Sequence, residues 1–155
     1  MGREIDEISG IVVDAAFRIH ADLGPGLLES VYQVVLSRDL KRRGLQVVDQ
    51  SLVSFEYDGL QFENALRVDL LVEGQLVVEL KSVEELASVH YKQVLTYLRL
   101  LHLQVGLLIN FGAPTFKEGI HRIVNRYSPS SAGTARLRVN DPTKSERGSS
   151  ECAGN

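Results

Sequence analysis

Two acidic residues and a lysine interrupt an otherwise apolar stretch of the chain. The segment RVDLLVEGQLVVELK, residues 67–81, is typical of two strands joined by a turn, and it contains Asp69, Glu79 and Lys81. Burying a charged group costs free energy unless the charge is paired or binds a metal ion. These residue types at this spacing therefore indicate either a cross-strand salt-bridge cluster on a solvated face or a site for a cation.

The geometry of this group depends on the length of the turn. If residues 73–75 form a three-residue loop, Val72 pairs with Leu76, and Asp69 then lies opposite Glu79. Directly paired residues point to the same side of a sheet, and the lysine two residues on shares that side. A two-residue loop without a bulge would put the two acids on opposite faces. The predicted site therefore requires the longer turn.

Two carboxylates that face each other repel, and a divalent cation between them reverses the sign of that interaction. Oxygen ligands suit Mg²⁺ or Mn²⁺, which keep several waters and also bind phosphate oxygens. Lys81 could then orient or activate the attacking water, or stabilise charge on a transferring phosphate. The same converging arrangement therefore permits two interpretations, a metal site for phosphoryl chemistry or a cross-strand salt-bridge cluster on a solvated face.

The elements that would position these residues follow from hydrophobic spacing. In the second helix we expect Val31, Val35, Leu36 and Leu40 to form the apolar stripe. Asp58-Gly59 predicts a type I′ hairpin turn. The order favours an α/β or α+β sandwich with a mixed β-sheet flanked by helices. The pattern predicts helices over residues 4–20, 28–43 and 84–101, and strands over 47–48, 52–57, 61–72, 76–81, 105–110 and 120–126.

Composition predicts one folded domain, residues 1–127, and a disordered tail rich in Ser, Gly and Pro, residues 128–155. The net charge of −3 disfavours a strongly basic nucleic-acid coat, but not an enzyme that holds phosphates through metal ions. The sequence contains no run of 18 apolar residues, so we expect no membrane span. The single cysteine excludes a disulfide framework within one chain and fits a reducing, cytoplasmic compartment.

Several motifs resemble a known family. The stretch GLLESVY, residues 26–32, matches the motif that names the GxxExxY protein family, whose members look like PD-(D/E)XK nucleases. The segments RVDLLV, VVELKSV, HYKQVLTYL and GLLINFG resemble that family in the same order. The resemblance covers roughly residues 5–127, although Val68 stands where the superfamily motif has proline. It implies a restriction-endonuclease-like core of helix, three-stranded meander, helix and strand.

The resemblance also implies roles for individual residues. Asp69 and Glu79 resemble the metal-binding acids, and Lys81 resembles the catalytic lysine. Gln93 resembles the glutamine of a Q-x-x-x-Y pattern, which positions water, lysine or phosphate. The further candidates are Glu29, as an additional metal-binding acid, the backbone carbonyl of Leu80, as a metal ligand, and Tyr32, His90 and Tyr97, as neighbours of the site.

Several of these candidates have an ordinary structural alternative. A carboxylate such as Glu29 in the first turn of a helix is favoured by the helix dipole. Tyr32 is typical of a packed side chain with a tethered hydroxyl. The stripe of His90, Gln93 and Tyr97 is also what a solvated helix face looks like.

The resulting functional prediction is a metal-dependent nuclease that uses Mg²⁺ or Mn²⁺ to hydrolyse phosphodiester bonds of nucleic acid, above all DNA. The alternative is a catalytically silent nuclease-fold module that binds nucleic acid or protein. A different metal-dependent hydrolase on the same fold is a third reading, since a fold does not fix a function. Many small nucleases pair to address two strands, so a homodimer is compatible with the first prediction.

Overall fold

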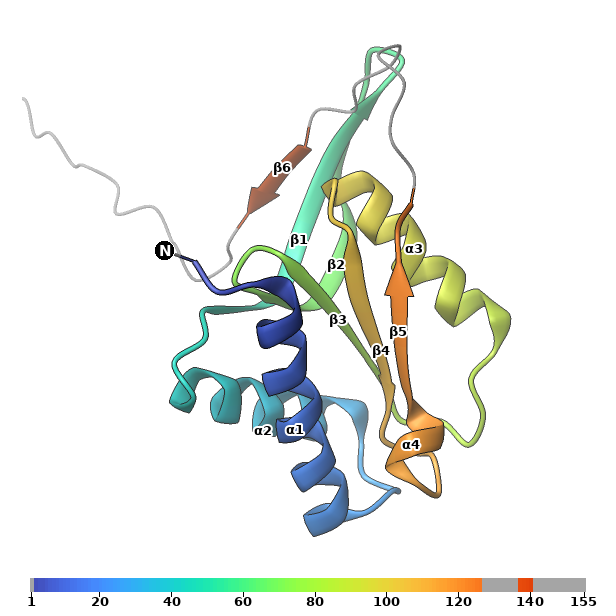
Figure 1. The fold of residues 1–155 in the computed structure, drawn as a ribbon. Coiled ribbons are helices and arrows are strands. Elements are labelled where there is room, and N and C mark those ends of the chain that lie inside the picture. The colour runs from blue at the N-terminus through green and yellow to red at the C-terminus, as the bar shows by residue number, and fades with distance from the viewer. Residues whose placement is uncertain (1, 127–136, 141–155) are drawn as a thin grey trace, which may run out of the picture.

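The computed structural model describes residues 2–126 and 137–140, which form one mixed sheet with helices on both faces (Figure 1). The six described strands lie in the order β5-β4-β3-β2-β1-β6. Only β3 and β4 run parallel, and α3 connects them. The fold class predicted from the sequence is confirmed. The elements are α1 (Ile5–Leu23), α2 (Glu29–Arg42), β1 (Val47–Tyr57), β2 (Leu60–Val72), β3 (Leu76–Lys81), α3 (Ser88–Leu101), β4 (Val105–Asn110), α4 (Phe116–Gly119), β5 (Ile120–Val124) and β6 (Leu137–Asn140).

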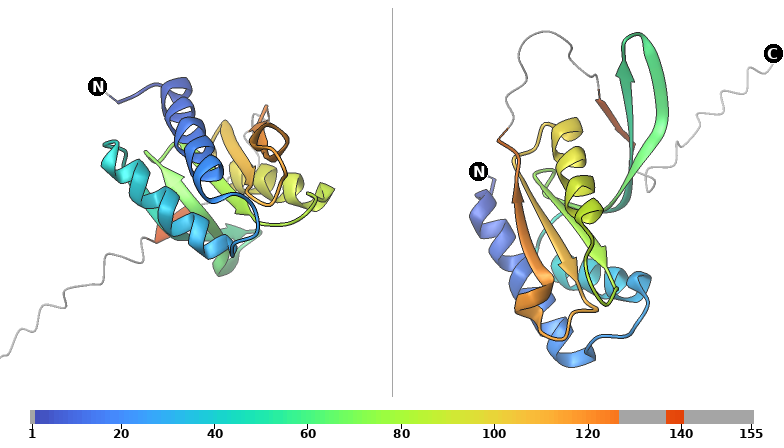
Figure 2. Two further views of the ribbon diagram at one scale, coloured as in Figure 1. Left: turned by 90° about the horizontal axis from the view of Figure 1, so that it is seen from below. Right: turned by 90° about the vertical axis from the view of Figure 1, so that its right-hand side faces the viewer.

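The sheet separates two hydrophobic clusters. Helices α1 and α2 cover one face, where Leu70 and Val78 belong to the larger cluster. Helix α3 covers the opposite face and packs on Leu71 and Val77 (Figure 2). Burial on both sides explains why β3 and β4 are almost continuously apolar. A charged residue in the middle of this sheet is therefore an exception that needs a partner.

The turn between β2 and β3 has the predicted length. Residues 73–75 form the turn, and Val72 pairs with Leu76. Glu73 and Gly74 have φ angles of 53° and 63°, and glycine adopts this left-handed conformation without a steric penalty. Because side chains alternate along β3, Glu79 and Lys81 point to the same side as Val77, which packs in the cluster under α3.

The long β1–β2 hairpin projects beyond the rest of the sheet (Figure 1). Asp58 and Gly59 both have positive φ angles, 49° and 76°, as the type I′ turn predicted from their sequence requires. The two short segments expected before this turn are one continuous strand, β1. A shift of register between Val53 and Phe55 bends the hairpin, so that its base stays in the sheet while its tip extends outward.

Two helices differ from the prediction in ways that affect the site. Helix α3 begins at Ser88 instead of residue 84, and Val89, expected on the inner side, is 60% exposed. His90 accounts for this start, because its ring nitrogen accepts a hydrogen bond from the Ala87 N–H and caps the helix.

In α2 the buried apolar residues are Tyr32, Leu36 and Leu40, while Val31 and Val35 are partly exposed. The stacking of the Tyr32 ring on Phe111, with centroids 4.4 Å apart, fixes this rotation of the helix.

A short strand lies within the segment predicted as a tail, residues 128–155. Residues 137–140 form β6, which pairs antiparallel with residues 52–55 of β1. The other residues of the predicted tail that follow Tyr127 lie outside the described residues. In the described part of the chain, no helix has the length and apolar character needed to cross a bilayer.

Candidate active site

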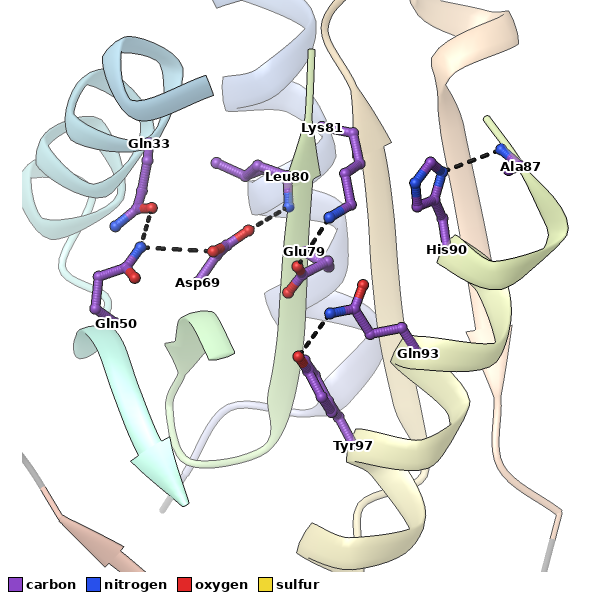
Figure 3. Close-up of polar contacts among 10 residues, drawn as sticks. All are labelled: Gln33, Gln50, Asp69, Glu79, Leu80, Lys81, Ala87, His90, Gln93 and Tyr97. Carbon is purple, nitrogen blue, oxygen red and sulfur yellow. Dashed lines mark hydrogen bonds and ion pairs between the residues drawn. The ribbon is translucent and has the colours of Figure 1, made fainter. Parts of the chain in front are cut away.

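Asp69 lies at the point where β2 and β3 separate. The last recorded pair of this ladder is Leu70 with Val78, and the carboxylate of Asp69 accepts a hydrogen bond from the Leu80 N–H at 2.8 Å (Figure 3). The side chain is only 6% exposed. Burial raises the pKa of Asp69, and the hydrogen bond from Leu80 and the charge of Lys81 lower it in part. The main chain of Leu80 thus lies against this carboxylate.

Glu79 is the acid of this group whose charged form is least compensated by its surroundings. Its side chain is buried, and its Oε2 atom has no hydrogen-bond partner among the described residues. Its Oε1 atom lies 3.6 Å from the Lys81 ammonium group. Burial, followed by the negative charge of Asp69, raises the pKa of Glu79 to about 8. The charged form of this carboxyl group is therefore costly unless a cation lies beside it.

The remaining residues predicted on this face gather around the same acid. The Lys81 side chain is 17% exposed, so its ammonium group is near solvent while its stem is packed. From α3, the Gln93 amide donates a hydrogen bond to the Tyr97 hydroxyl at 2.7 Å, beside Glu79 and Lys81 (Figure 3). Burial raises the pKa of Tyr97, which keeps its hydroxyl neutral. Acids, ammonium and amide therefore share one end of the sheet.

Glu29 approaches the group from the other side, as the first residue of α2. Burial and then the charge of Asp69 raise its pKa, while Lys81 and Arg67 lower it. Glu29 is thus electrostatically coupled to the site. Arg67 is exposed and contributes positive charge at the same edge.

The family comparison bears on these residues. The family model of the PD-(D/E)XK nuclease superfamily matches residues 6–123, which include all of them. The chain belongs to the PD-(D/E)XK nuclease superfamily. No curated protein and no solved structure matched the chain. The superfamily match thus agrees with the architecture, and the positions of Asp69, Glu79 and Lys81 follow from the geometry above.

Two glutamines at this site of the nuclease fold carry no motif and were not predicted. Gln50 stands in β1 opposite Asp69, and its amide donates toward the Asp69 carboxylate at 3.5 Å. The same amide contacts the Gln33 side-chain oxygen on α2 (Figure 3). Gln50 has a φ of 50°, an uncommon value for a residue inside a strand. This local break in β1 allows its amide to contact the acid.

Asn110 fixes the chain that leaves the site. It ends β4 beside Lys81 and accepts hydrogen bonds from the Val83 and Gly112 N–H groups, both at 3.0 Å. Its amide donates back to the Val83 carbonyl at 2.9 Å. Asn110 therefore holds the segment after Lys81 and does not itself contact the acids.

Two further candidates lie outside the gathered group. The Tyr32 hydroxyl donates to the Gly24 carbonyl and accepts from the Leu27 N–H, so Tyr32 packs with a tethered hydroxyl. His90 points away from the acids and caps α3 (Figure 3). The geometry gives both residues structural roles in the loop and helix that border the site.

The donor set fits a hard divalent cation, although it is sparse. Among residues 2–126 and 137–140, no three His, Cys, Asp or Glu side chains form a group able to hold a metal ion. Mg²⁺, however, is commonly bound through one or two carboxylates together with waters and substrate phosphates. Asp69 and Glu79 supply two carboxylates, and the buried, unpartnered Oε2 of Glu79 is an oxygen that a cation would satisfy.

Proposed function

We propose that the protein is a metal-dependent nuclease that hydrolyses phosphodiester bonds of nucleic acid, above all DNA, through its D…ExK residues. The observation that carries this proposal is the buried pair of Asp69 and Glu79 with raised pKa values beside the Lys81 ammonium group. Two adjacent acids that are costly to ionise gain most from a divalent cation. The GLLESVY motif supports placing the chain in the GxxExxY group of the superfamily.

In this proposal Asp69 and Glu79 would hold Mg²⁺ or Mn²⁺, with Glu29 and the Leu80 carbonyl as additional ligand candidates. The ion would supply Lewis-acid stabilisation of the charge that develops on the phosphate. Lys81 assists the attacking water or the phosphate oxygens from its position next to Glu79. The Gln93 amide, oriented by Tyr97, positions water, lysine or phosphate.

The alternative is a catalytically silent module that keeps the fold to bind nucleic acid or protein. The absence of a three-ligand metal group in the described residues favours it. The ion pair between Lys81 and Glu79, which such a module does not need, speaks against it. The single cysteine is compatible with action in the cytoplasm. A homodimer would allow cleavage of both strands of a duplex.

A cleavage assay tests the proposal. Single-stranded, duplex and branched DNA, and RNA, are incubated with the protein in Mg²⁺, Mn²⁺ or EDTA. We expect metal-dependent cleavage that falls at least 100-fold in Lys81→Ala and in Glu79→Ala, since each removes a group at the reacting phosphate. Cleavage that survives both substitutions undiminished would place the activity elsewhere, and no cleavage of any substrate would favour the silent module.

A further inference from the structure

A groove lies along the outer side of α2, next to the site but separate from it. It has a volume of about 750 Å³ and runs between α2 and the start of β1. Gln33 lies at one end of its lining, and Arg42, the last residue of α2, lies at the other. The buried Ser37 and the exposed Val34 lie between them. The groove is thus an open channel that follows the helix axis.

The groove concentrates positive charge on a protein whose net charge is −3. Three cations, Arg38, Lys41 and Arg42, line it against one acid, Asp49. Lys41 is paired with Asp49 at 2.8 Å. Neither arginine has an ion-pair partner within residues 2–126 and 137–140. Two guanidinium groups without an ion pair among the described residues therefore line the groove.

The same two arginines extend this positive surface around the helix. Arg38 and Arg42 also line a second hollow of about 300 Å³ between α2 and α1, where Arg18 joins them. This hollow also contains two acids, Asp22 and Asp39, of which Asp39 is bonded to Arg43 at 3.1 Å. The basic surface thus continues from β1 across α2 to α1, as a polyanion lying across the helix would require.

A chain of contacts joins the groove to the acids. Gln33, in the groove lining, bonds Gln50, and Gln50 donates to Asp69 (Figure 3). At 1.5 Å per residue, α2 is about 20 Å long, which corresponds to the rise of about six base pairs along the axis of B-DNA. A strand cleaved at the acids and lying along α2 would therefore place phosphates several nucleotides from the scissile bond beside Arg38 and Arg42.

We propose that this groove binds the sugar–phosphate backbone of the nucleic acid that is cleaved at Asp69 and Glu79. The inference rests on the proposed nuclease function and adds the path of the substrate to it. Arg38 and Arg42 contact phosphates several nucleotides from the scissile bond. They contribute to binding and not to the chemical step, because they lie toward the far end of α2 from the acids.

The test combines kinetics with salt dependence. Arg38→Gln/Arg42→Gln is compared with wild type for cleavage of a 20-base-pair DNA duplex and a 20-nucleotide single strand. We expect KM to rise about 10-fold while kcat changes less than twofold, because lost phosphate contacts weaken binding. Binding is measured in the Lys81→Ala background, where the substrate stays intact. There, the double substitution should make the negative slope of log Kobs, the observed association constant, against log salt concentration shallower by about 1.8 for the duplex and about 1.4 for the single strand.

Two controls separate a phosphate track from a general charge effect. Arg38→Lys/Arg42→Lys keeps both charges and should retain the wild-type salt slope. Lys117→Gln removes an exposed charge on α4, away from the groove, and should leave KM and the slope unchanged. Thermal unfolding of each variant, monitored by circular dichroism, establishes that the fold is intact.

The outcomes distinguish this inference from the proposed function. The groove inference alone would be overturned if Arg38→Gln/Arg42→Gln had the KM and salt slope of wild type while Glu79→Ala still lost cleavage. Absence of both binding and cleavage in the wild-type protein would overturn both proposals. Arginine-dependent binding of polyglutamate, with DNA binding unaffected, would identify an acidic protein as the occupant and overturn the inference as well.

Discussion

Glu79 shows how one side chain can couple stability to function. It is 3% exposed, has an unpartnered oxygen and faces a second acid, so its charged form is costly in the absence of a cation. The Lys81 ammonium group offsets this cost only in part, since the pKa of Glu79 is still raised to about 8. Without a bound cation, the charged form of Glu79 therefore lowers the free energy of unfolding.

This conflict predicts an unusual dependence of stability on pH. The folded pKa of about 8 lies above the ordinary value of 4.5, so the native state binds the extra proton between these pH values. The contribution of Glu79 to the free energy of unfolding is therefore fully present below pH 4.5 and is lost as the pH rises through 8. Without divalent ions, we expect the free energy of unfolding of wild type to fall by a few kcal/mol between pH 5 and 9 relative to Glu79→Gln.

Urea unfolding in EDTA at pH 5, 7 and 9 measures this difference. Glu79→Gln resembles the protonated side chain at every pH and so serves as the matched reference. Parallel pH profiles for the two proteins would show that Glu79 ionises normally and would contradict this description of the site.

Gln50 gives a second prediction at the residue scale. Its amide restrains Asp69, so Gln50→Ala should weaken Mn²⁺ binding by about 10- to 100-fold, as loss of a group that orients a metal ligand does. Gln50→Gly removes the same amide but relieves the positive φ of 50°, so it should weaken Mn²⁺ binding without lowering the free energy of unfolding.

Isothermal titration calorimetry and urea unfolding check both substitutions. Gln61→Ala, at the exposed tip of the same hairpin, is the matched control and should bind Mn²⁺ as wild type does. Unchanged affinity in both Gln50 variants would mean that Asp69 is positioned without the amide.

Residue spacing predicts part of the group and misses the rest for a physical reason. Asp69, Glu79 and Lys81 could be expected to meet because the period of a strand and the length of one turn fix their side. Gln33 and Gln50 come from α2 and β1, and their contact depends on a positive φ inside a strand, which the amino-acid type does not reveal.

At the scale of elements, Asn110 joins two strands that are distant in sequence. Asn110→Ala would leave the N–H groups of Val83 and Gly112 and the Val83 carbonyl without their partner. We expect the free energy of unfolding to fall by about 1–3 kcal/mol, since these partly buried groups would lose their hydrogen bonds. Urea unfolding measures the change, and a loss below about 0.5 kcal/mol would show that these contacts contribute little.

Local sequence signals explain which elements could be predicted. Asp58-Gly59 fixes its hairpin through two positive φ angles, and the apolar run of residues 105–110 fixes β4. Hydrophobic spacing predicts the start of α3 four residues too early, because it does not encode the contact through which His90 caps the helix. Strand β6 was missed because its pairing with β1 is non-local.

At the scale of the whole molecule, the sequence predicts one domain in residues 1–127, although β6 adds to its edge. A chain that ends at residue 127 should fold, lose less than about 2 kcal/mol of stability, and keep its cleavage rate within twofold, because no gathered site residue lies beyond that point. A chain that ends at residue 141 keeps β6 and is the matched control. Failure of the shorter chain alone to fold would make β6 part of the domain.

The order of the sheet was not predicted, yet it determines where the site lies. The parallel pairing of β3 with β4 puts Asn110 beside Lys81, and the pairing of β1 with β2 puts Gln50 beside Asp69. These pairings join residues about 20 to 30 positions apart. They follow from burying both faces of the sheet under α1, α2 and α3, a constraint that acts on the complete chain.

The most direct measurement is calorimetric titration of Mn²⁺ into the protein at pH 8, without nucleic acid. We expect saturable binding that weakens at least 100-fold in Asp69→Asn, while Asp22→Asn, which removes an exposed acid outside the site, should bind as wild type does. Equal affinity in wild type and Asp69→Asn, or no binding to wild type, would contradict a cation site built from Asp69 and Glu79.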